Sequence, residues 1–252
     1  FYGRRRLSGK RNLCARRQLV IVMDIDNILR PIFRGKCLFG DQPFFNARCL
    51  KITEALEHYY SNIQEEYKKV MERYDELPPF QEFSPHQKYI SNDDKWKLFF
   101  LRGATLWFKK NCLQMPYTYG ILKIHDEVVS AYISVLGPNK RLNPHFGPYS
   151  GILRLHLALD IPDENKCYME VAGIRKPWIQ GKCMLFDDTY EHFAVNDSDK
   201  KRAVLFMDIL KPLPEPWNTL NRVILFASRF FPFVFIPWFR HKIWERKFYK
   251  NE

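Results

Sequence analysis

The stretch "NPHFGPYSGILRLHLALDIP", residues 143–162, decides the fold class. Side chains of a β-strand point alternately to its two faces, and here leucine takes every second position from residue 153 to residue 159. The opposite face of the predicted strand carries Arg154 and His156 between Ile152 and Ala158. A guanidinium and an imidazole that share one face of a leucine-backed strand either line a site or form a satisfied, buried polar pair.

The same alternation recurs between about Tyr117 and Ile209. The alternating segments are SAYISVL, ILRLHLAL, CYMEVAG, KCMLFDD and RAVLFMDIL. Turn signals such as Pro138-Asn139, Pro162-Asp163 and Gly173 separate them. Several short strands at this spacing predict a mainly β fold, an antiparallel sandwich or barrel such as a jelly roll.

The regions on either side differ from this β domain. Apolar residues in 46–76 recur with a period of roughly 3.6, which predicts a helical extension that ends at Pro78-Pro79. We therefore divide the chain into a basic arm (1–45), a helical extension (46–89), the β domain (90–216) and a basic, aromatic tail (217–252).

The charge of the chain is concentrated at its ends. Residues 1–36 contribute +8 and residues 217–252 contribute +5 to the formal net charge of +12, so the region between them is close to neutral. Nucleic-acid readers usually carry Lys, Arg and exposed aromatic residues on the folded face that docks, so we expect no nucleic-acid partner. The six cysteines form no CxxC pair and indicate a reducing compartment.

Both ends of the chain suit an anionic membrane surface. In the tail, aromatic residues alternate with Arg and Lys, which is typical of the headgroup layer, although an apolar tail packed on the domain is the alternative. Residues 223–239 contain Arg229 and are short for a spanning helix. The arm resembles the cytoplasmic flank of a membrane helix. We therefore expect the protein at the cytoplasmic face of a membrane, anchored by a helix that this sequence does not include.

Histidine and arginine residues occur near the ends of the predicted strands. His145 precedes the strand of Arg154 and His156, His192 follows another strand, and Arg202 begins "RAVLFMDIL". Two neutral imidazoles from different strands can bind a divalent first-row metal, and a nearby guanidinium matches a carboxylate. Residue types alone leave structural histidines as the alternative, because no short ligand motif such as HExxH is present.

Ordered motifs in this region resemble one protein family. "SVLGPNKRLNPHFGPYSGILRLHLAL", then WxxGxxxxFDDTYEH, then an arginine ten residues after that histidine, resemble the aspartyl/asparaginyl β-hydroxylase family. The resemblance covers about residues 90–212. It implies an iron(II)- and 2-oxoglutarate-dependent oxygenase on a double-stranded β-helix. Such enzymes use dioxygen to hydroxylate a C–H bond while 2-oxoglutarate is converted into succinate and CO2.

The site residues follow from matching the chain to the family's motifs. His145 and His192 correspond to the iron ligands and are the expected catalytic residues. Arg202 corresponds to the residue that pairs with the distal carboxylate of 2-oxoglutarate. The resemblance implies that four further residues lie at the co-substrate: Trp96, Ser134, Arg154 and His156.

The substrate is less well defined than the reaction. Two residues after His145, where many related oxygenases carry a carboxylate ligand, this chain has Gly147, so water would complete the iron shell. Hydroxylases of Asp and Asn side chains share this glycine. However, "GPYSG" and "TYEHFAVN" resemble the branch that hydroxylates acyl chains of lipid A or ornithine lipids. We therefore expect a membrane lipid as substrate, with a peptide as the alternative.

Two other functions fit single features of the sequence. "VIVMDIDNIL" imitates the first motif of haloacid-dehalogenase-type phosphatases through Asp24 and Asp26, but the rest of the chain predicts an antiparallel sheet. A non-catalytic jelly-roll binding module is the second alternative, and it would release no succinate. We expect Asp187 and Asp188 to shape or support the turn before His192 rather than to bind the metal.

Overall fold

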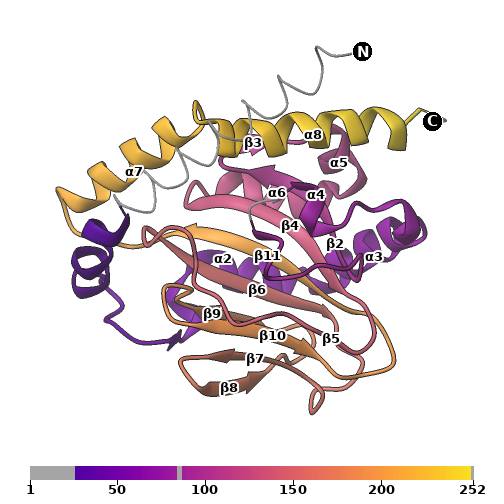
Figure 1. Ribbon diagram of the computed structural model, residues 1–252, viewed down its shortest axis with the longest axis horizontal. Helices are drawn as coiled ribbons and strands as arrows, with labels where there is room; N and C mark the ends of the chain where they lie inside the picture. The colour runs from indigo at the N-terminus through magenta and orange to yellow at the C-terminus, as the bar shows by residue number, and fades with distance from the viewer. Residues whose placement is uncertain (1–25, 84–86, 251–252) are drawn as a thin grey trace.

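Two antiparallel sheets dominate the computed structural model, which describes residues 26–83 and 87–250 (Figure 1). The larger sheet has the strand order β1-β9-β6-β11-β4-β2-β3 and the smaller one β5-β10-β7-β8. This arrangement confirms the predicted jelly-roll fold. The strands are β1 (Phe44–Phe45), β2 (Trp96–Gly103), β3 (Leu106–Trp107), β4 (Val128–Leu136), β5 (Lys140–Arg141), β6 (Ile152–Asp160), β7 (Cys167–Val171), β8 (Ile174–Pro177), β9 (Cys183–Phe186), β10 (His192–Asn196) and β11 (Arg202–Leu210).

Helices precede, interrupt and follow the sheets. They are a first helix over residues 26–35, then α2 (Lys51–His58), α3 (Tyr60–Met71), α4 (Phe80–Phe83), α5 (Lys109–Gln114), α6 (Pro116–Ile124), α7 (Trp217–Ser228) and α8 (Pro232–Phe248). Short 3-10 turns lie at η1 (Ala47–Cys49) and η2 (Tyr74–Glu76).

The two faces of β6 have different neighbours. Its leucine face packs against the helices, because Leu155 belongs to one apolar cluster with Ile52 of α2 and Ile63 of α3. On its other face, Ala158 shares a second cluster with Val171 of the smaller sheet. The larger sheet is thus the middle of three layers, and the polar face of β6 points into the space between the sheets.

Strand β11 fixes the register of its neighbours. It pairs with β6 so that Arg154 lies opposite Asp208 and His156 opposite Phe206. On its other side it pairs with β4, where Ser134 lies opposite Val204. Three neighbouring strands therefore present their polar side chains toward one region between the sheets.

The helical extension is less regular than the sequence pattern predicts. The continuous helix predicted over 46–76 is divided into α2 and α3 at Tyr59 and begins only at Lys51. Asn46 explains the late start, because its Oδ1 accepts a hydrogen bond from the backbone N–H of Arg48 (3.1 Å) and closes a tight turn instead.

The basic arm and the aromatic tail are described in part. Asp24 and most of the arm's basic residues lie outside the described residues, whereas residues 26–35 form a helix. In the tail, α8 packs on the domain through the buried His241 and Phe248. No helix in the described part of the chain is long and apolar enough to cross a membrane.

Candidate functional site

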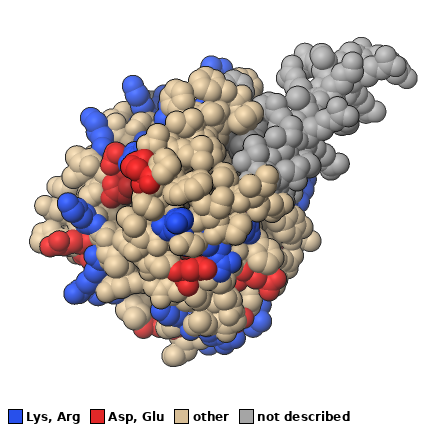
Figure 2. Space-filling view, turned by 90° about the vertical axis from the view of Figure 1, so that its left-hand side faces the viewer, with Lys and Arg blue, Asp and Glu red and all other residues tan. Residues whose placement is uncertain are grey.

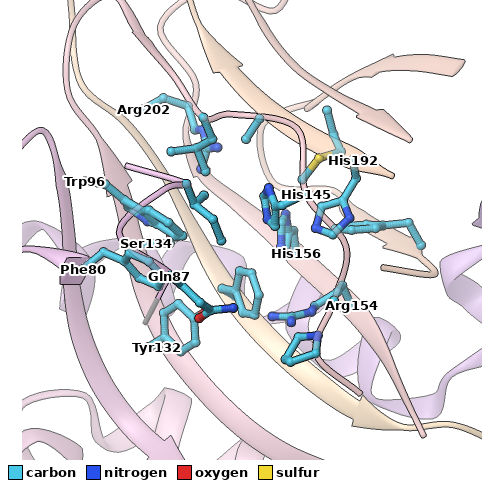
Figure 3. Close-up of a pocket in the computed structure, with 18 residues that line it drawn as sticks. Phe80, Gln87, Trp96, Tyr132, Ser134, His145, Arg154, His156, His192 and Arg202 are labelled. Carbon is cyan, nitrogen blue, oxygen red and sulfur yellow. The ribbon is translucent and has the colours of Figure 1, made fainter. Parts of the chain in front are cut away.

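The seven residues singled out in the sequence line one cavity between the sheets (Figure 3). Figure 3 shows three histidines on one side of this cavity and the aromatic rings of Phe80, Trp96 and Tyr132 on the other. The seven residues are Trp96, Ser134, His145, Arg154, His156, His192 and Arg202.

A backbone bridge holds His145 and His192 side by side. The N–H of His145 donates to the carbonyl of His192 (3.1 Å), the N–H of His192 donates back (2.9 Å), and the ring centroids are 4.3 Å apart. Each Nδ1 lies close to the carbonyl oxygen two residues earlier, at 2.7 Å from Asn143 and 2.9 Å from Tyr190. An Nδ1–H that donates to a carbonyl leaves Nε2 with its lone pair free for a metal.

The protonation state of both imidazoles also favours metal binding. Burial lowers the pKa of His145 to about 4, with the neighbouring His192 adding to the effect. Burial also lowers the pKa of His192 to about 4. Both rings are therefore neutral at pH 7, which is the form that binds a first-row divalent metal.

The described residues give His145 and His192 no third protein ligand of the usual kind. Among the described residues, no group of three or more His, Cys, Asp or Glu could hold a metal ion. Gly147 has no room for a side chain, because Oδ2 of Asp188 fills the space that a Cβ would need. Oδ1 of Asp188 is buried and has no hydrogen-bond partner among the described residues. Asp188 thus supplies a carboxylate beside the histidine pair from the turn that precedes His192.

Arg202 is a buried cation with no counter-ion among the described residues. The side chain is 2% exposed, and its Nε and Nη1 have no hydrogen-bond partner in the described part of the chain. Its guanidinium lies 3.9 Å from the ring centroid of Trp178, and burial lowers its pKa to about 9. A buried guanidinium of this kind is costly unless an anion joins it.

Ser134 and Trp96 form the neighbouring wall of the cavity. The indole N–H of Trp96 donates to Oγ of Ser134 (3.0 Å), and both side chains are buried. Phe80 stacks on Trp96 with 3.8 Å between the ring centroids. The Ser134 hydroxyl is therefore fixed in place, and its own hydrogen remains available to an acceptor in the cavity.

Arg154 is engaged in ion pairs. Its Nε and Nη2 lie 2.8 and 2.7 Å from Oδ2 of Asp188, and its Nη1 lies 3.0 Å from Oδ1 of Asp208. Burial alone would lower the pKa of Arg154, but the two carboxylates outweigh it and raise that pKa above its usual value. The resemblance implies a contact with the co-substrate, yet in this structure the guanidinium is directed at Asp188 and Asp208.

His156 is the third imidazole of the cavity. It is 2% exposed, and neither ring nitrogen has a hydrogen-bond partner among the described residues. Burial, followed by the positive charges of Arg202 and Arg154, lowers the pKa of His156 well below its usual value. A neutral imidazole with a free N–H can donate to an oxygen placed between it and Arg202.

The comparison with known proteins decides the family. A profile described as Aspartyl/Asparaginyl beta-hydroxylase matches residues 57–212, which is more than half of the chain. The chain belongs to the aspartyl/asparaginyl β-hydroxylase family. Hydroxylation is accordingly its class of reaction.

The relatives of this β-hydroxylase family member differ in how much they share with it. An "Ornithine lipid ester-linked acyl 2-hydroxylase" from Rhizobium tropici is 38% identical over 83% of this chain and 75% of its own length. Human "Aspartate beta-hydroxylase domain-containing protein 2" is 34% identical over 47% of this chain and 34% of its own length. Human "Aspartyl/asparaginyl beta-hydroxylase" is 28% identical over 64% and 21%. The chain thus spans only about a third or less of the two human proteins.

Some residues that line the cavity of this β-hydroxylase family member are missing from the set that the sequence predicts. Phe206 lines the cavity and Asp208 pairs with Arg154. Their alternation with Arg202 along one strand places all three on one face, so the pattern contained the signal. Phe80 of the short helix α4 and Gln87 also line the cavity, and the sequence around them carries no periodic signal.

Proposed function

We propose that the protein is an Fe(II)- and 2-oxoglutarate-dependent hydroxylase that uses dioxygen to hydroxylate an acyl chain of a membrane lipid of the ornithine-lipid type. We place it at the cytoplasmic face of an anionic membrane. The observation that carries the proposal is the guanidinium of Arg202, whose Nε and Nη1 have no partner among the described residues, in the same cavity as two neutral histidines.

The residues of the cavity fit both the metal and the co-substrate. Nε2 of His145 and of His192 would hold the iron, and imidazole is a common ligand for it. Arg202 and the Ser134 hydroxyl would hold one carboxylate of 2-oxoglutarate, because a guanidinium fork matches a carboxylate in a bidentate pair. His156 would donate its N–H to a further oxygen of the dicarboxylate. Bound iron would supply the redox chemistry with dioxygen.

Other residues would position these groups and keep water out. The ion pair with Arg154 fixes the Asp188 carboxylate beside the histidines, where it can accept a hydrogen bond from a water or substrate group. Tyr132 and Phe206 stack with 4.4 Å between their centroids, and Phe100 packs on Tyr132 at 4.9 Å. This aromatic wall excludes water from the reacting C–H bond.

The apolar end of the cavity supports an acyl chain as substrate. Tyr132, Phe206 and Phe80 offer aromatic surface to an acyl chain, and Gln87 and Arg154 are polar side chains beside them. The Rhizobium relative named as an ornithine lipid acyl 2-hydroxylase shares more of its length with this chain than the human relatives do. Gly147 is the feature that favours the alternative, hydroxylation of Asp or Asn in a protein.

Succinate release with a mass measurement on the substrate tests the proposal. The protein is incubated with Fe(II), ascorbate, 2-oxoglutarate and air, and with ornithine-lipid vesicles, lipid A vesicles or an Asp/Asn-containing peptide. We expect succinate in step with one added oxygen atom on the lipid acyl chain, and neither product from the His192→Ala variant.

Each other outcome has a definite meaning. Added oxygen on the peptide alone would keep the cofactors and replace the substrate. No succinate from folded, iron-loaded protein with any of these substrates would favour the non-catalytic binding module.

A further inference from the structure

The segment Pro148–Gly151, which carries the "PYSG" letters of the lipid-branch resemblance, contacts α7 rather than the cavity along most of its length. The hydroxyl of Tyr149 donates to Oδ1 of Asn221 (2.7 Å), and Nδ2 of Asn221 donates to the carbonyl of Gly151 (2.8 Å). Asn221 is fully buried, and its Oδ1 fills the space that a side chain at residue 151 would need. This PYSG segment is therefore a socket for α7.

The same segment holds the first helix. Ser150 donates from both its backbone N–H and its hydroxyl to Oδ1 of the buried Asp26 (2.6 Å each). Asp26 also accepts from Arg30, whose guanidinium reaches the carbonyls of Gly147 (3.2 Å) and Thr189 (3.4 Å). The first helix is thus tied to both loops that present the histidine pair.

The two helices form one unit beside the cavity. Leu29 and Phe33 of the first helix share an apolar cluster with Trp217 and Ile224 of α7. Figure 1 shows the two helices together at the left of the molecule. Both lie outside residues 57–212, so the region that matches the family profile does not account for them.

Their outward side chains are apolar and exposed. Ile28 on the first helix is 69% exposed, and on α7 and just beyond it Val223, Phe226 and Phe230 are 57%, 55% and 75% exposed. A spacing of three residues places Val223 and Phe226 on one face of α7, and the ring of Phe230, two residues beyond the helix, lies 5.9 Å from that of Phe226. We name these four side chains the apolar stripe. Figure 2 views the molecule from this end, where uncharged surface runs between separate clusters of charge.

The segment that carries most of the apolar stripe is basic in sequence. Residues 216–244 contain Arg222, Arg229, Arg240 and Lys242 and no Asp or Glu. Of these, Arg222 pairs with Asp126 (3.2 Å) and Lys242 with Glu245 (2.6 Å). The guanidinium of Arg229 lies over the ring of Phe226, at 4.9 Å from its centroid. Phenylalanine beside arginine suits the boundary between acyl chains and anionic headgroups.

We propose that the apolar stripe inserts into an anionic lipid bilayer and that the PYSG segment fixes this membrane-binding unit next to the mouth of the cavity. Pro148 itself lines the cavity, so the socket connects the lipid surface directly to the site. The role of the socket rests on the proposed function, because it brings a lipid that is still embedded in the bilayer to the histidines. Binding of the bilayer by the apolar stripe does not depend on turnover.

Vesicle co-sedimentation without iron or 2-oxoglutarate tests whether the apolar stripe binds an anionic bilayer. The full chain is mixed with vesicles of phosphatidylcholine alone or with phosphatidylglycerol. We expect binding to the anionic vesicles and about a tenfold loss of partitioning in the double variant Phe226→Ser/Phe230→Ser. The matched control is Ile174→Ser/Ile179→Ser, which changes two side chains of similar exposure on the smaller-sheet side and should bind as the unaltered protein does.

Two results would contradict the proposed membrane-binding role of the apolar stripe. Equal partitioning of the Phe226→Ser/Phe230→Ser variant and its control into anionic vesicles would show that the apolar stripe does not bind the membrane. Sedimentation velocity that shows a dimer, dissociated by the same two substitutions, would make the stripe an interface between copies of the chain.

Turnover measurements test the socket separately. In Asn221→Ala, which keeps the apolar stripe, we expect vesicle binding to persist, hydroxylation of vesicle-embedded lipid to fall about tenfold or more, and hydroxylation of the same lipid in detergent micelles to change far less. Equal losses in vesicles and micelles would contradict the role of the socket. Vesicle binding that depends on the apolar stripe, without hydroxylation of any lipid, would contradict the proposed lipid hydroxylase function but support the membrane-binding role of the stripe.

Discussion

The carboxylate of Asp188 occupies the space that a side chain on Gly147 would need, and the backbone N–H of Gly147 donates to the carbonyl of Asp188 (2.7 Å). These two contacts press the loop that carries His145 against the turn that precedes His192. Glycine is required at residue 147 by this close approach. The carboxylate beside the histidine pair therefore comes from the opposite loop, and none can come from residue 147 itself.

A methyl group at residue 147 should separate the two loops. We expect Gly147→Ala to lower the free energy of unfolding by about 1–3 kcal/mol, because Asp188 is held by Arg154 and cannot yield. Urea denaturation measures the loss. In a protein that already carries Asp188→Ala, Gly147→Ala should lower the free energy of unfolding by less, so the losses of the two single variants should not add. Independent, additive effects would show that the loops do not meet as described.

Loss of either histidine should remove the metal and leave the fold. His145→Ala and His192→Ala each delete one imidazole, and neither side chain belongs to the apolar clusters of the two sheets. We expect Co(II) binding, measured by calorimetry as an oxygen-stable substitute for Fe(II), to weaken at least about a hundredfold, together with loss of succinate release. Circular dichroism should remain that of the unaltered protein. Tight Co(II) binding by His192→Ala would contradict the assignment.

The sequence predicted the strands well because their pattern is local. Alternation along β6 is visible from residue to residue, and the turn residues between strands need no partner to be recognised. The helical extension was predicted as one helix, since its periodicity continues through Tyr59. The break there and the late start at Lys51 depend on local hydrogen bonds that periodicity does not report.

The site was predicted as a set of residues, without its pairings. The resemblance gave Arg202 the distal carboxylate of 2-oxoglutarate and placed Arg154 at the co-substrate as well, whereas the structure gives Arg154 two carboxylates and gives Arg202 none among the described residues. The ion pair of Arg154 with Asp188 joins residues 34 positions apart in the chain. No spacing rule covers such a pair, because it arises from the closing of one loop on another.

Replacement of Arg202 by an uncharged side chain of similar length should stabilise the folded protein and abolish binding of the co-substrate. We expect Arg202→Met to raise the free energy of unfolding by about 1–4 kcal/mol when no 2-oxoglutarate is present, since a buried charge without a partner is lost. Thermal denaturation with and without 2-oxoglutarate should show stabilisation by the ligand only in the unaltered protein. A less stable Arg202→Met variant would indicate that Arg202 already has an internal counter-ion.

Replacement of Arg154 by methionine should have the opposite effect and destabilise the folded protein. Arg154→Met leaves the buried carboxylates of Asp188 and Asp208 facing each other without a cation, which costs about 3–5 kcal/mol. Burial already raises the pKa of Asp208. The variant should therefore recover part of its stability as the pH falls and a carboxylate takes up a proton. Urea denaturation at pH 7 and pH 5 measures this; a loss of equal size at both values would show that the carboxylates are not the cause.

The buried His241 of α8 should make the stability of the protein depend on pH. Its Nε2 lies 3.0 Å from Nδ2 of Asn111, its ring packs against Phe108 at 4.1 Å, and burial, with Lys242 nearby, lowers its pKa to about 3. The unfolded chain takes up this proton near pH 6.5 and the folded chain does not, so stability is lost as the pH falls below 6.5. In His241→Phe, which keeps an aromatic ring among aromatic neighbours, this loss should be smaller by about 2 kcal/mol between pH 6.5 and pH 5. Asn111 keeps its hydrogen bond to the carbonyl of Phe100 (2.8 Å) in that variant, so the comparison isolates the titration. Parallel stability profiles of the two proteins over this range would show that His241 is protonated in the folded state as readily as in the unfolded chain.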